Sequence, residues 1–399
     1  PRLLESALRA CPSTSLTRIH FVDCRRVDAR VIDTIVAKWP DLVFLHIGGC
    51  SQTIADETFW NLSKRLRRLR ALDMSGLRRL GKSVNTSWSS RELPILALSS
   101  SLECLYLAGC EQLQFPVLER ISQQLAPAFA RRLEEGALLA LAQQVKEGNG
   151  MHVWNTLELE LDLDSRQLLH ANRRADMDTI LNLGWKNLRT LDLCLCGSSG
   201  RGIPRGLVGF LGIFSGGSLR HVDISGCDEV TDADIQVLAT TCANSLTSFN
   251  GFGCNYGDEA IKALAYNCEN LAYLDVSSCY DVTDVGIMSL CPTDGIYSSY
   301  EDDTQLHLER RQGCPRLRTL KISNLPLVTG QAIFAIGGMH CDYDTAIKYH
   351  SCGGLKNLLV LIANSCGNVM SLAVEATMRK LPLLVELDAR DLEGTISLR

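Results

Sequence analysis

The sequence predicts an α/β solenoid, in which short strands and helices repeat along most of the chain. The first observation is a motif that occurs three times in succession: Leu219-x-x-Val222-x-Ile224-x-x-Cys227, Leu246-x-x-Phe249-x-Gly251-x-x-Cys254 and Leu271-x-x-Leu274-x-Val276-x-x-Cys279. The motifs start at 219, 246 and 271, so they are 27 and 25 residues apart, a period typical of repeat architectures. The second observation is that helix-like segments with apolar residues three and four apart follow, as in residues 232–242 and 258–268.

Each motif explains how such a chain could build a core. The spaced aliphatic residues point inward, and the residues between them point to the opposite face, because side chains alternate along a strand. One strand and one helix cannot bury their apolar faces alone, so neighbouring units must stack. The pattern therefore predicts a right-handed leucine-rich-repeat solenoid, a ribonuclease-inhibitor-like horseshoe with a concave sheet.

The motif predicts about twelve repeats in a single solenoid domain over residues 1–399. The weakest is Trp154-x-x-Leu157-x-Leu159, and the twelve start at residues 16, 42, 69, 102, 154, 188, 219, 246, 271, 317, 358 and 384. Three intervals, of 52 (102 to 154), 46 (271 to 317) and 41 (317 to 358) residues, are too long for one unit. They indicate insertions near 111–150, 292–312 and 337–356, and such insertions often lie in loops that contact partners.

Cysteine recurs at the ninth position of the motif, where the chain leaves the strand. Cysteine is small and readily buried, so we predict structural, reduced cysteines and not disulfides. This use of the 17 cysteines indicates a cytoplasmic protein, with nuclear or cytoskeletal association as a variant. The predicted structural cysteines are Cys24, Cys50, Cys110, Cys196, Cys227, Cys254, Cys279 and Cys366.

The Thr-Asp pairs that follow some of these cysteines predict helix caps. Thr231-Asp232 and Thr283-Asp284 come directly before helix-like segments. Their side-chain oxygens can accept hydrogen bonds from the first backbone N–H groups of the helix that follows.

These repeats resemble the cysteine-containing leucine-rich repeats of F-box/leucine-rich-repeat proteins. The resemblance rests on L-x-x-L-x-[LVI]-x-x-C, on V-T-D at residues 230–232 and 282–284, and on a second cysteine before the next strand, as at Cys268 and Cys314. It implies the target-recognition part of a ubiquitin-ligase adaptor, since in that family the repeats recruit a target while an F-box binds a Skp-type adaptor. Similar repeats occur in structural subunits, so a scaffold subunit of an axonemal or ribonucleoprotein assembly is the alternative.

The predicted concave face can be read from the residue between the last two core aliphatics of each motif. Carboxylates take six of the twelve positions, which are His20, His46, Asp73, Tyr106, Glu158, Asp192, Asp223, Asn250, Asp275, Lys321, Ile362 and Asp388. An acidic strip with aromatic neighbours suits a basic segment of a protein partner. The alternative is that the aspartates only form hydrogen bonds within their own repeat. The predicted partner-binding residues are Phe44, Asp73, Tyr106, Glu158, Asp192, Asp223, Tyr273 and Asp275.

Other chemistries find little support in the sequence. The net charge of −5 argues against nucleic acid as the main ligand, and no apolar run approaches the ~18 residues of a membrane span. The glycines of residues 197–206 lack the G-K-[ST] of a phosphate-binding loop. We therefore predict a non-enzymatic protein-interaction module without a cofactor.

Two further clusters can each be interpreted as ordinary structural or surface residues or as a ligand site. The spacing of His340, Cys341, His350 and Cys352 matches no familiar zinc finger, so ordinary repeat residues are favoured over a zinc site. Several arginines form a basic cluster, for which a solvated surface is favoured over an acidic partner, a phosphoinositide-like ligand or RNA. These are Arg65, Arg67, Arg68, Arg70, Arg78 and Arg79.

Overall fold

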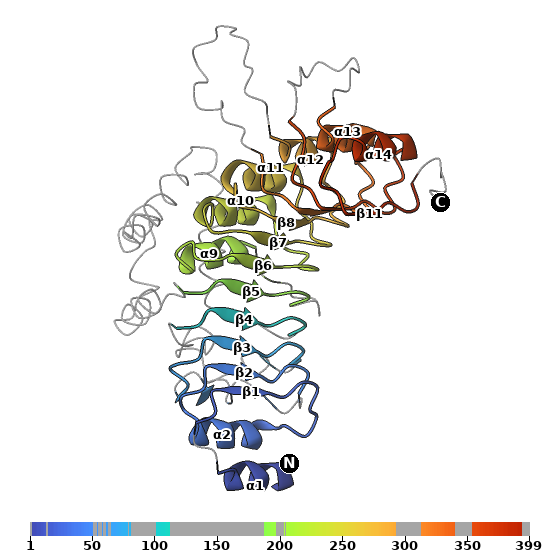
Figure 1. Cartoon of the computed structure of the whole chain (residues 1–399). Coiled ribbons are helices and arrows are strands. Elements are labelled where there is room, and N and C mark those ends of the chain that lie inside the picture. Colours follow the sequence, from blue (N-terminus) through green and yellow to red (C-terminus); the bar gives the residue numbers. More distant parts are fainter. Residues whose placement is uncertain are drawn as a thin grey trace, which may run out of the picture. The chain divides into compact units, whose positions relative to one another are not determined.

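A computed structural model describes residues 2–12, 15–50, 54, 58, 61–62, 65–78, 80, 101–111, 187–196, 203, 205–292, 313–339 and 353–392. The chain forms two compact units, Pro1–Glu229 (unit 1) and Val230–Arg399 (unit 2). In both units short parallel strands follow one another in sequence order; in unit 2 they alternate with helices, and in unit 1 described helices precede β1, β2 and β6 (Figure 1). The predicted leucine-rich-repeat α/β solenoid is confirmed, while a single domain over 1–399 stays a prediction.

Unit 1 builds one parallel sheet from six described strands. Corresponding motif positions lie opposite each other, as Leu105 does Leu191, so the inward-pointing leucines of successive repeats form one continuous buried layer. The strands are β1 (Arg18–His20), β2 (Phe44–His46), β3 (Ala71–Asp73), β4 (Cys104–Tyr106), β5 (Thr190–Asp192) and β6 (His221–Asp223), with helices α1 (Arg2–Ala10), α2 (Ala29–Lys38) and α9 (Leu207–Phe214).

Helix α2 illustrates why the segments between strands are helical. Asp28 caps its start by accepting a hydrogen bond from the Val31 N–H (3.1 Å), and the helix buries an apolar stripe that includes Ile32 and Ile35. At its other end the Lys38 ammonium donates to the carbonyls of Leu8, Arg9 and Cys11 at 2.6–2.7 Å. This contact holds the last turn of α1 against α2.

Unit 2 repeats the same arrangement with five described strands. They pair in parallel, so that Leu274, Leu320, Leu361 and Leu387 lie in one register. The strands are β7 (Ser248–Asn250), β8 (Tyr273–Asp275), β9 (Thr319–Lys321), β10 (Val360–Ile362) and β11 (Glu386–Asp388). The helices are α10 (Asp232–Thr241), α11 (Asp258–Asn267), α12 (Asp284–Ser289), α13 (Gly330–Ile336) and α14 (Ser371–Met378).

The predicted strand near Trp154 does not lie between its expected neighbours. Strands β4 and β5 pair directly, with Tyr106 opposite Asp192. The sheet therefore has no room for a strand from residues 154–159 at that point, and the prediction that this motif supplies one there is wrong. The motif was the weakest of the twelve because it begins with Trp154 and has Asp162 at the ninth position, where the other motifs have Cys or Leu. Glu158 lies outside the described residues.

The motif cysteines form a hydrogen-bonded ladder between repeats. Seven of the eight are buried, and Cys24, in the first repeat, is half-buried. In several repeats the thiol donates to the carbonyl of the last core aliphatic residue of the preceding repeat, as from Cys279 Sγ to the Gly251 carbonyl oxygen (3.1 Å) and from Cys196 Sγ to that of Leu107 (3.0 Å). Burial raises the pKa of Cys279 to about 11, so this group is a thiol donor at neutral pH.

In the Thr-Asp pairs, the threonine and the aspartate form hydrogen bonds with different repeats. Thr283 caps its own helix, because its Oγ1 accepts from the Val285 N–H at 3.1 Å. Asp284, the first residue of α12, instead accepts from the next repeat: from Thr329 N–H (2.7 Å) and Thr329 O–H (2.6 Å). Asp258, at the same place in α11, likewise accepts from Thr283 N–H (2.8 Å), Thr283 O–H (2.6 Å) and Gly286 N–H (3.1 Å). The predicted capping of the following helix is therefore confirmed for Thr283, whereas Asp232 and Asp284 accept hydrogen bonds from the next repeat and tie it to their own.

Candidate functional site: the open face of the sheet

One face of each sheet carries the side chains between the buried aliphatics, and we call it the open face. Its strands show a buried middle residue between two mostly half-buried ones. In unit 1 two rows cross this face, because corresponding residues of parallel strands lie opposite each other. The middle row consists of the first residue of each strand, and a third row described below precedes it. Its members are Arg18, Phe44, Ala71, Cys104, Thr190 and His221. The carboxyl-end row consists of the last residue of each strand: His20, His46, Asp73, Tyr106, Asp192 and Asp223.

A third row lies at the amino end of these strands, one residue before each of them. Its members Arg70, Arg189 and Arg220 are exposed, and Glu103 is half-buried. Neighbours in this row meet, since the Arg70 Nε donates to Glu103 Oε1 at 2.8 Å and the Arg189 N–H donates to the Glu103 carbonyl. We call this the amino-end row.

At the β1–β3 end of unit 1 the predicted contact residues bind one another. The His20 ring stacks on Phe44 with centroids 4.5 Å apart, and the Arg18 guanidinium lies 5.5 Å from the Phe44 ring centroid. His46 Nε2 lies 3.1 Å from Asp73 Oδ2. Phe44 and Asp73 thus belong to a preformed aromatic and histidine cluster.

At the β5–β6 end two carboxylates lie opposite each other. Burial, and then the charges of Asp223 and Asp73, raise the pKa of Asp192 to about 6, against the lowering effect of the Cys194 N–H. The pKa of Tyr106 is raised by burial and by its neighbours Cys104, Asp73 and Asp192. The β3–β6 part of the row therefore has a negative potential that disfavours further negative charge.

The aspartates of the row also form the local hydrogen bonds that were the alternative interpretation. Asp73, Asp192, Asp223 and Asp275 each accept from the backbone N–H two residues later at 3.0 Å. Asn250 does the same with Phe252 at 3.2 Å. Each bond uses Oδ1, so these aspartates have a structural role within their own repeat.

In unit 2 the corresponding residues neutralise each other. Lys321 Nζ lies 3.6 Å from Asp275 Oδ2 and 5.3 Å from the Tyr273 ring centroid. The pKa of Lys321 is raised, first by its hydrogen bond with Tyr273 and further by Asp275. Asp275 is only 6% exposed. Asp275 and Tyr273 are therefore less available for contacts with a partner than the sequence predicted.

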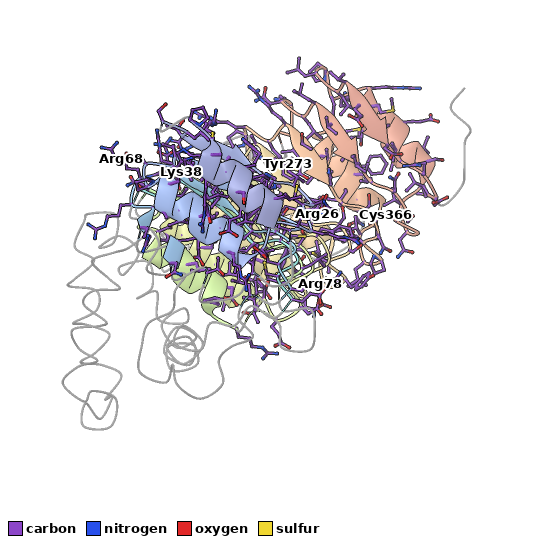
Figure 2. All side chains as sticks on the ribbon, turned by 90° about the horizontal axis from the view of Figure 1, so that it is seen from below. Arg26, Lys38, Arg68, Arg78, Tyr273 and Cys366 are labelled. Atoms are coloured by element: carbon purple, nitrogen blue, oxygen red, sulfur yellow. The ribbon has the colours of Figure 1, made fainter. Side chains whose placement is uncertain are left out.

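The arginines predicted to form one basic cluster are separated in the structure. Arg68 precedes β3 and Arg78 follows it, and they lie on opposite sides of unit 1 (Figure 2). Arg68 pairs with Asp41 at 3.3 Å, and Arg78 pairs with Glu111 at 3.3 Å. Arg78 therefore lies apart from Arg68, and each is an exposed member of an ion pair, as the solvated-surface interpretation expects. Arg79 lies outside the described residues.

Other predicted features fall outside the described part of the chain. His340, Cys341, His350 and Cys352 lie there, as do most residues of the three predicted insertions. Among the residues that the structure describes, no group of three His, Cys, Asp or Glu side chains could hold a metal ion. Within the same residues, no helix has the length and apolar character needed to cross a bilayer.

Comparison with known proteins agrees with the repeat pattern. A family described as Leucine Rich repeat matches residues 218–239 and 267–291. No curated protein matches the chain. The repeat motif, the parallel sheet and this family match define a leucine-rich-repeat protein.

Two solved structures are similar to the chain at low sequence identity. One is from the Rad7 and Elc1 complex in yeast, with 15% identity, a TM-score of 0.39, and coverage of 96% of this chain and 83% of that one. The other is an internalin (InlF) of Listeria monocytogenes, with 14% identity, a TM-score of 0.39, and coverage of 98% and 94%. Likenesses of this strength add nothing to the fold already described.

Proposed function

We propose that this protein is a non-enzymatic protein-interaction module that recognises its partner with the open face of unit 1. The observation that carries the proposal is the pairing of Asp192 with Asp223 on neighbouring strands, within a face that also presents Tyr106 and Phe44. Solenoids of stacked repeats commonly use such extended surfaces for binding. We further propose that the module is the target-recognition part of a ubiquitin-ligase adaptor of the F-box/leucine-rich-repeat kind, acting in the cytoplasm.

The charge of this face favours a basic segment as the partner. The raised pKa of Asp192 reflects a carboxylate that is partly desolvated and repelled by its neighbours. A lysine or arginine placed beside Asp192 would relieve that repulsion and favour the ionised form. Charge complementarity of this kind acts chiefly on the association rate and on its salt dependence.

A structural subunit of a large assembly is the second candidate. The long intervals between repeats support it, since they indicate insertions near 111–150, 292–312 and 337–356. Insertions of this kind often carry partner contacts. Under this alternative, deletion of residues 117–147 weakens complex formation, whereas substitutions on the open face do not.

The experiment is affinity capture from the native source with quantitative mass spectrometry, using the full chain and two charge-matched variants. The first variant, Asp192→Asn/Asp223→Asn, removes two charges from the open face. The second, Asp41→Asn/Glu229→Gln, removes two charges from exposed ion pairs elsewhere in unit 1. We expect partners to be lost with the first variant and kept with the second. Partners kept by both variants but lost with the 117–147 deletion would overturn the proposal.

The identity of the captured proteins separates the two roles. A Skp-type adaptor and a cullin in the captured set support the ligase role. A fixed stoichiometric set of assembly subunits without them contradicts it and supports the scaffold alternative. Reconstitution of the full-length protein with a purified Skp-type adaptor on a sizing column provides the direct check.

A further inference from the structure

We propose that the β1–β2 end of the open face binds a glutamate or aspartate side chain of the partner, through Arg18 and His20 beside the Phe44 ring. This inference rests on the proposed function and adds a second contact to the one at Asp192 and Asp223. The partner segment is then acidic at one end and basic at the other.

Four side chains form a square on the first two strands. Arg18 lies opposite Phe44, and His20 lies opposite His46. The His20 and Phe44 rings stack with their centroids 4.5 Å apart, and the two histidine rings are 6.1 Å apart. The Arg18 guanidinium lies 5.5 Å from the Phe44 centroid. A cation and an imidazole are therefore held together beside one aromatic ring.

The cation of this square is accessible to a ligand. Arg18 and His20 are exposed on either side of the buried Ile19. His46 Nε2 lies 3.1 Å from Asp73 Oδ2, so the carboxylate of the next strand already has a partner in this square. Among the residues that the structure describes, no carboxylate lies within ion-pair distance of Arg18. Its guanidinium therefore has N–H donors available for an anion.

A carboxylate matches this site better than a more highly charged anion. Arginine binds a carboxylate through two parallel hydrogen bonds, and an imidazole N–H of His20 can add a third. Arg18 is the one member of the square whose positive charge is permanent, because arginine stays protonated in proteins. One positive charge balances one carboxylate, whereas a phosphate monoester carries about −1.5 to −2 at neutral pH.

The rest of the face favours a protein segment over a nucleic acid. An aromatic ring beside an arginine also suits a stacked base. Further along the row, however, Asp192 lies opposite Asp223, and burial followed by the charges of Asp223 and Asp73 raises the pKa of Asp192 to about 6. A phosphate backbone along the row would meet these like charges. A protein segment can instead change from acidic to basic side chains.

The distance between the two contacts sets the length of the segment. Four strand pairings separate β1 from β5. At ~4.7–4.9 Å between neighbouring strands, they span about 19 Å. An extended chain advances ~3.3 Å per residue, so about six residues reach from His20 to Asp192.

The test uses synthetic peptides whose binding to the full chain is measured by fluorescence anisotropy. The dipolar peptide carries a glutamate, about five serine and threonine residues and then a pair of lysines. The basic peptide has glutamine in place of the glutamate, and the phosphopeptide has phosphoserine there. Each peptide is made in both orders along the chain. We expect the better order of the dipolar peptide to bind at least about fivefold tighter than the other two peptides.

Variants of the protein assign that difference to the square. Arg18→Gln/His20→Gln should make the dipolar and basic peptides bind alike. The matched control is Arg30→Gln, since Arg30 is an exposed arginine on α2, and it should keep the difference. Arg18→Glu should bind a peptide with lysine in place of the glutamate at least about fivefold tighter than the unchanged protein does, a gain that a misfolded protein cannot show.

The outcomes separate this inference from the proposed function. Equal or absent binding of the dipolar and basic peptides, tighter binding of the phosphopeptide, or Arg18-dependent binding of a single-stranded oligothymidylate each overturns the inference. If native partners are still lost with Asp192→Asn/Asp223→Asn in such a case, the proposed function stands and its partner has no carboxylate contact at β1–β2. If the dipolar peptide binds as expected but native partners ignore that variant, the proposed function fails and the carboxylate site stands.

Discussion

The strand pairs β5–β6 and β8–β9 use the same motif position in opposite ways. In unit 1 Asp192 lies opposite Asp223, two like charges on adjacent strands. In unit 2 Asp275 lies opposite Lys321, which contacts both its carboxylate and the Tyr273 ring. The backbone register is the same in both pairs, and each aspartate accepts from the backbone N–H two residues later. The fold therefore tolerates either arrangement and does not determine which charge occupies this motif position.

Under the proposed function, the two regions divide stability and binding between them. Around β8–β9 the carboxylates are answered by the next repeat: Asp275 by Lys321, and Asp258 by the start of α12. Around β5–β6 the carboxyl-end row places two aspartates opposite each other, and their repulsion contributes to the raised pKa of Asp192. Three substitutions test this division, in order of decreasing effect.

Replacing Asp258 by alanine should have the largest effect. The carboxylate accepts from two N–H groups and one O–H of the next repeat, and its loss leaves these donors at the start of α12 unsatisfied. We expect the free energy of unfolding to fall by about 2–3 kcal/mol, measured by denaturant titration. The control is Glu259→Ala, since Glu259 is exposed and pairs only with Lys262 in its own helix. Equal effects of the two changes would contradict the role of Asp258 between repeats.

Replacing Lys321 by methionine should have an intermediate effect. Methionine keeps an unbranched apolar stem against the Tyr273 ring but removes the charge that answers Asp275, which is 6% exposed. Because Lys321 itself is partly exposed, we expect a loss of about 1–2 kcal/mol and not the larger cost of a fully buried pair. Adding Asp275→Asn to Lys321→Met should restore most of that loss. If the double variant is no more stable than the single one, the pair does not stabilise unit 2.

Replacing Asp192 by asparagine should have the smallest effect, and of opposite sign. Its pKa is raised from 3.8 to about 6, so the folded state binds the proton more readily than the unfolded state. Stability is therefore lost as pH rises from 3.8 through about 6. Asparagine can still accept from the Cys194 N–H but carries no charge. After allowance for solvent screening, we expect a gain of about 1 kcal/mol at pH 8 that disappears below pH 4.

Asp41→Asn is the matched control for this last change, because Asp41 is an exposed acid paired with Arg68. It should give no gain at pH 8. Thermal unfolding of both variants at pH 4 and pH 8 makes the measurement. A gain that is equal at both pH values would mean that Asp192→Asn acts through packing and not through charge.

Much of the fold could be predicted from the sequence because the same motif recurs in successive repeats. The leucines at fixed offsets predicted the strands, and the order of the motifs predicted the order of the parallel sheet. The motif at Trp154 misled because alternation alone, without a Cys or Leu at the ninth position, is a weak strand signal. The candidate site was predicted only in part. The residues of the carboxyl-end row could be predicted, because side chains alternate along a strand. The groups that these side chains contact come from other repeats, and the spacing within one repeat does not reveal them.

Gly251 shows most clearly what each level decided. The sequence by itself determined that residue 251 occupies a core aliphatic position, because it stands where Ile224 and Val276 stand in the adjacent motifs. Only the tertiary structure shows why glycine is needed there. A Cβ atom on Gly251 would lie 2.0 Å from the Tyr256 hydroxyl, which donates to the Gly251 carbonyl at 3.2 Å and fills the missing volume. The local sequence pattern determines which residues face inward. Contacts between repeats, which close packing imposes, determine which side chain fills a given space and which charged groups pair.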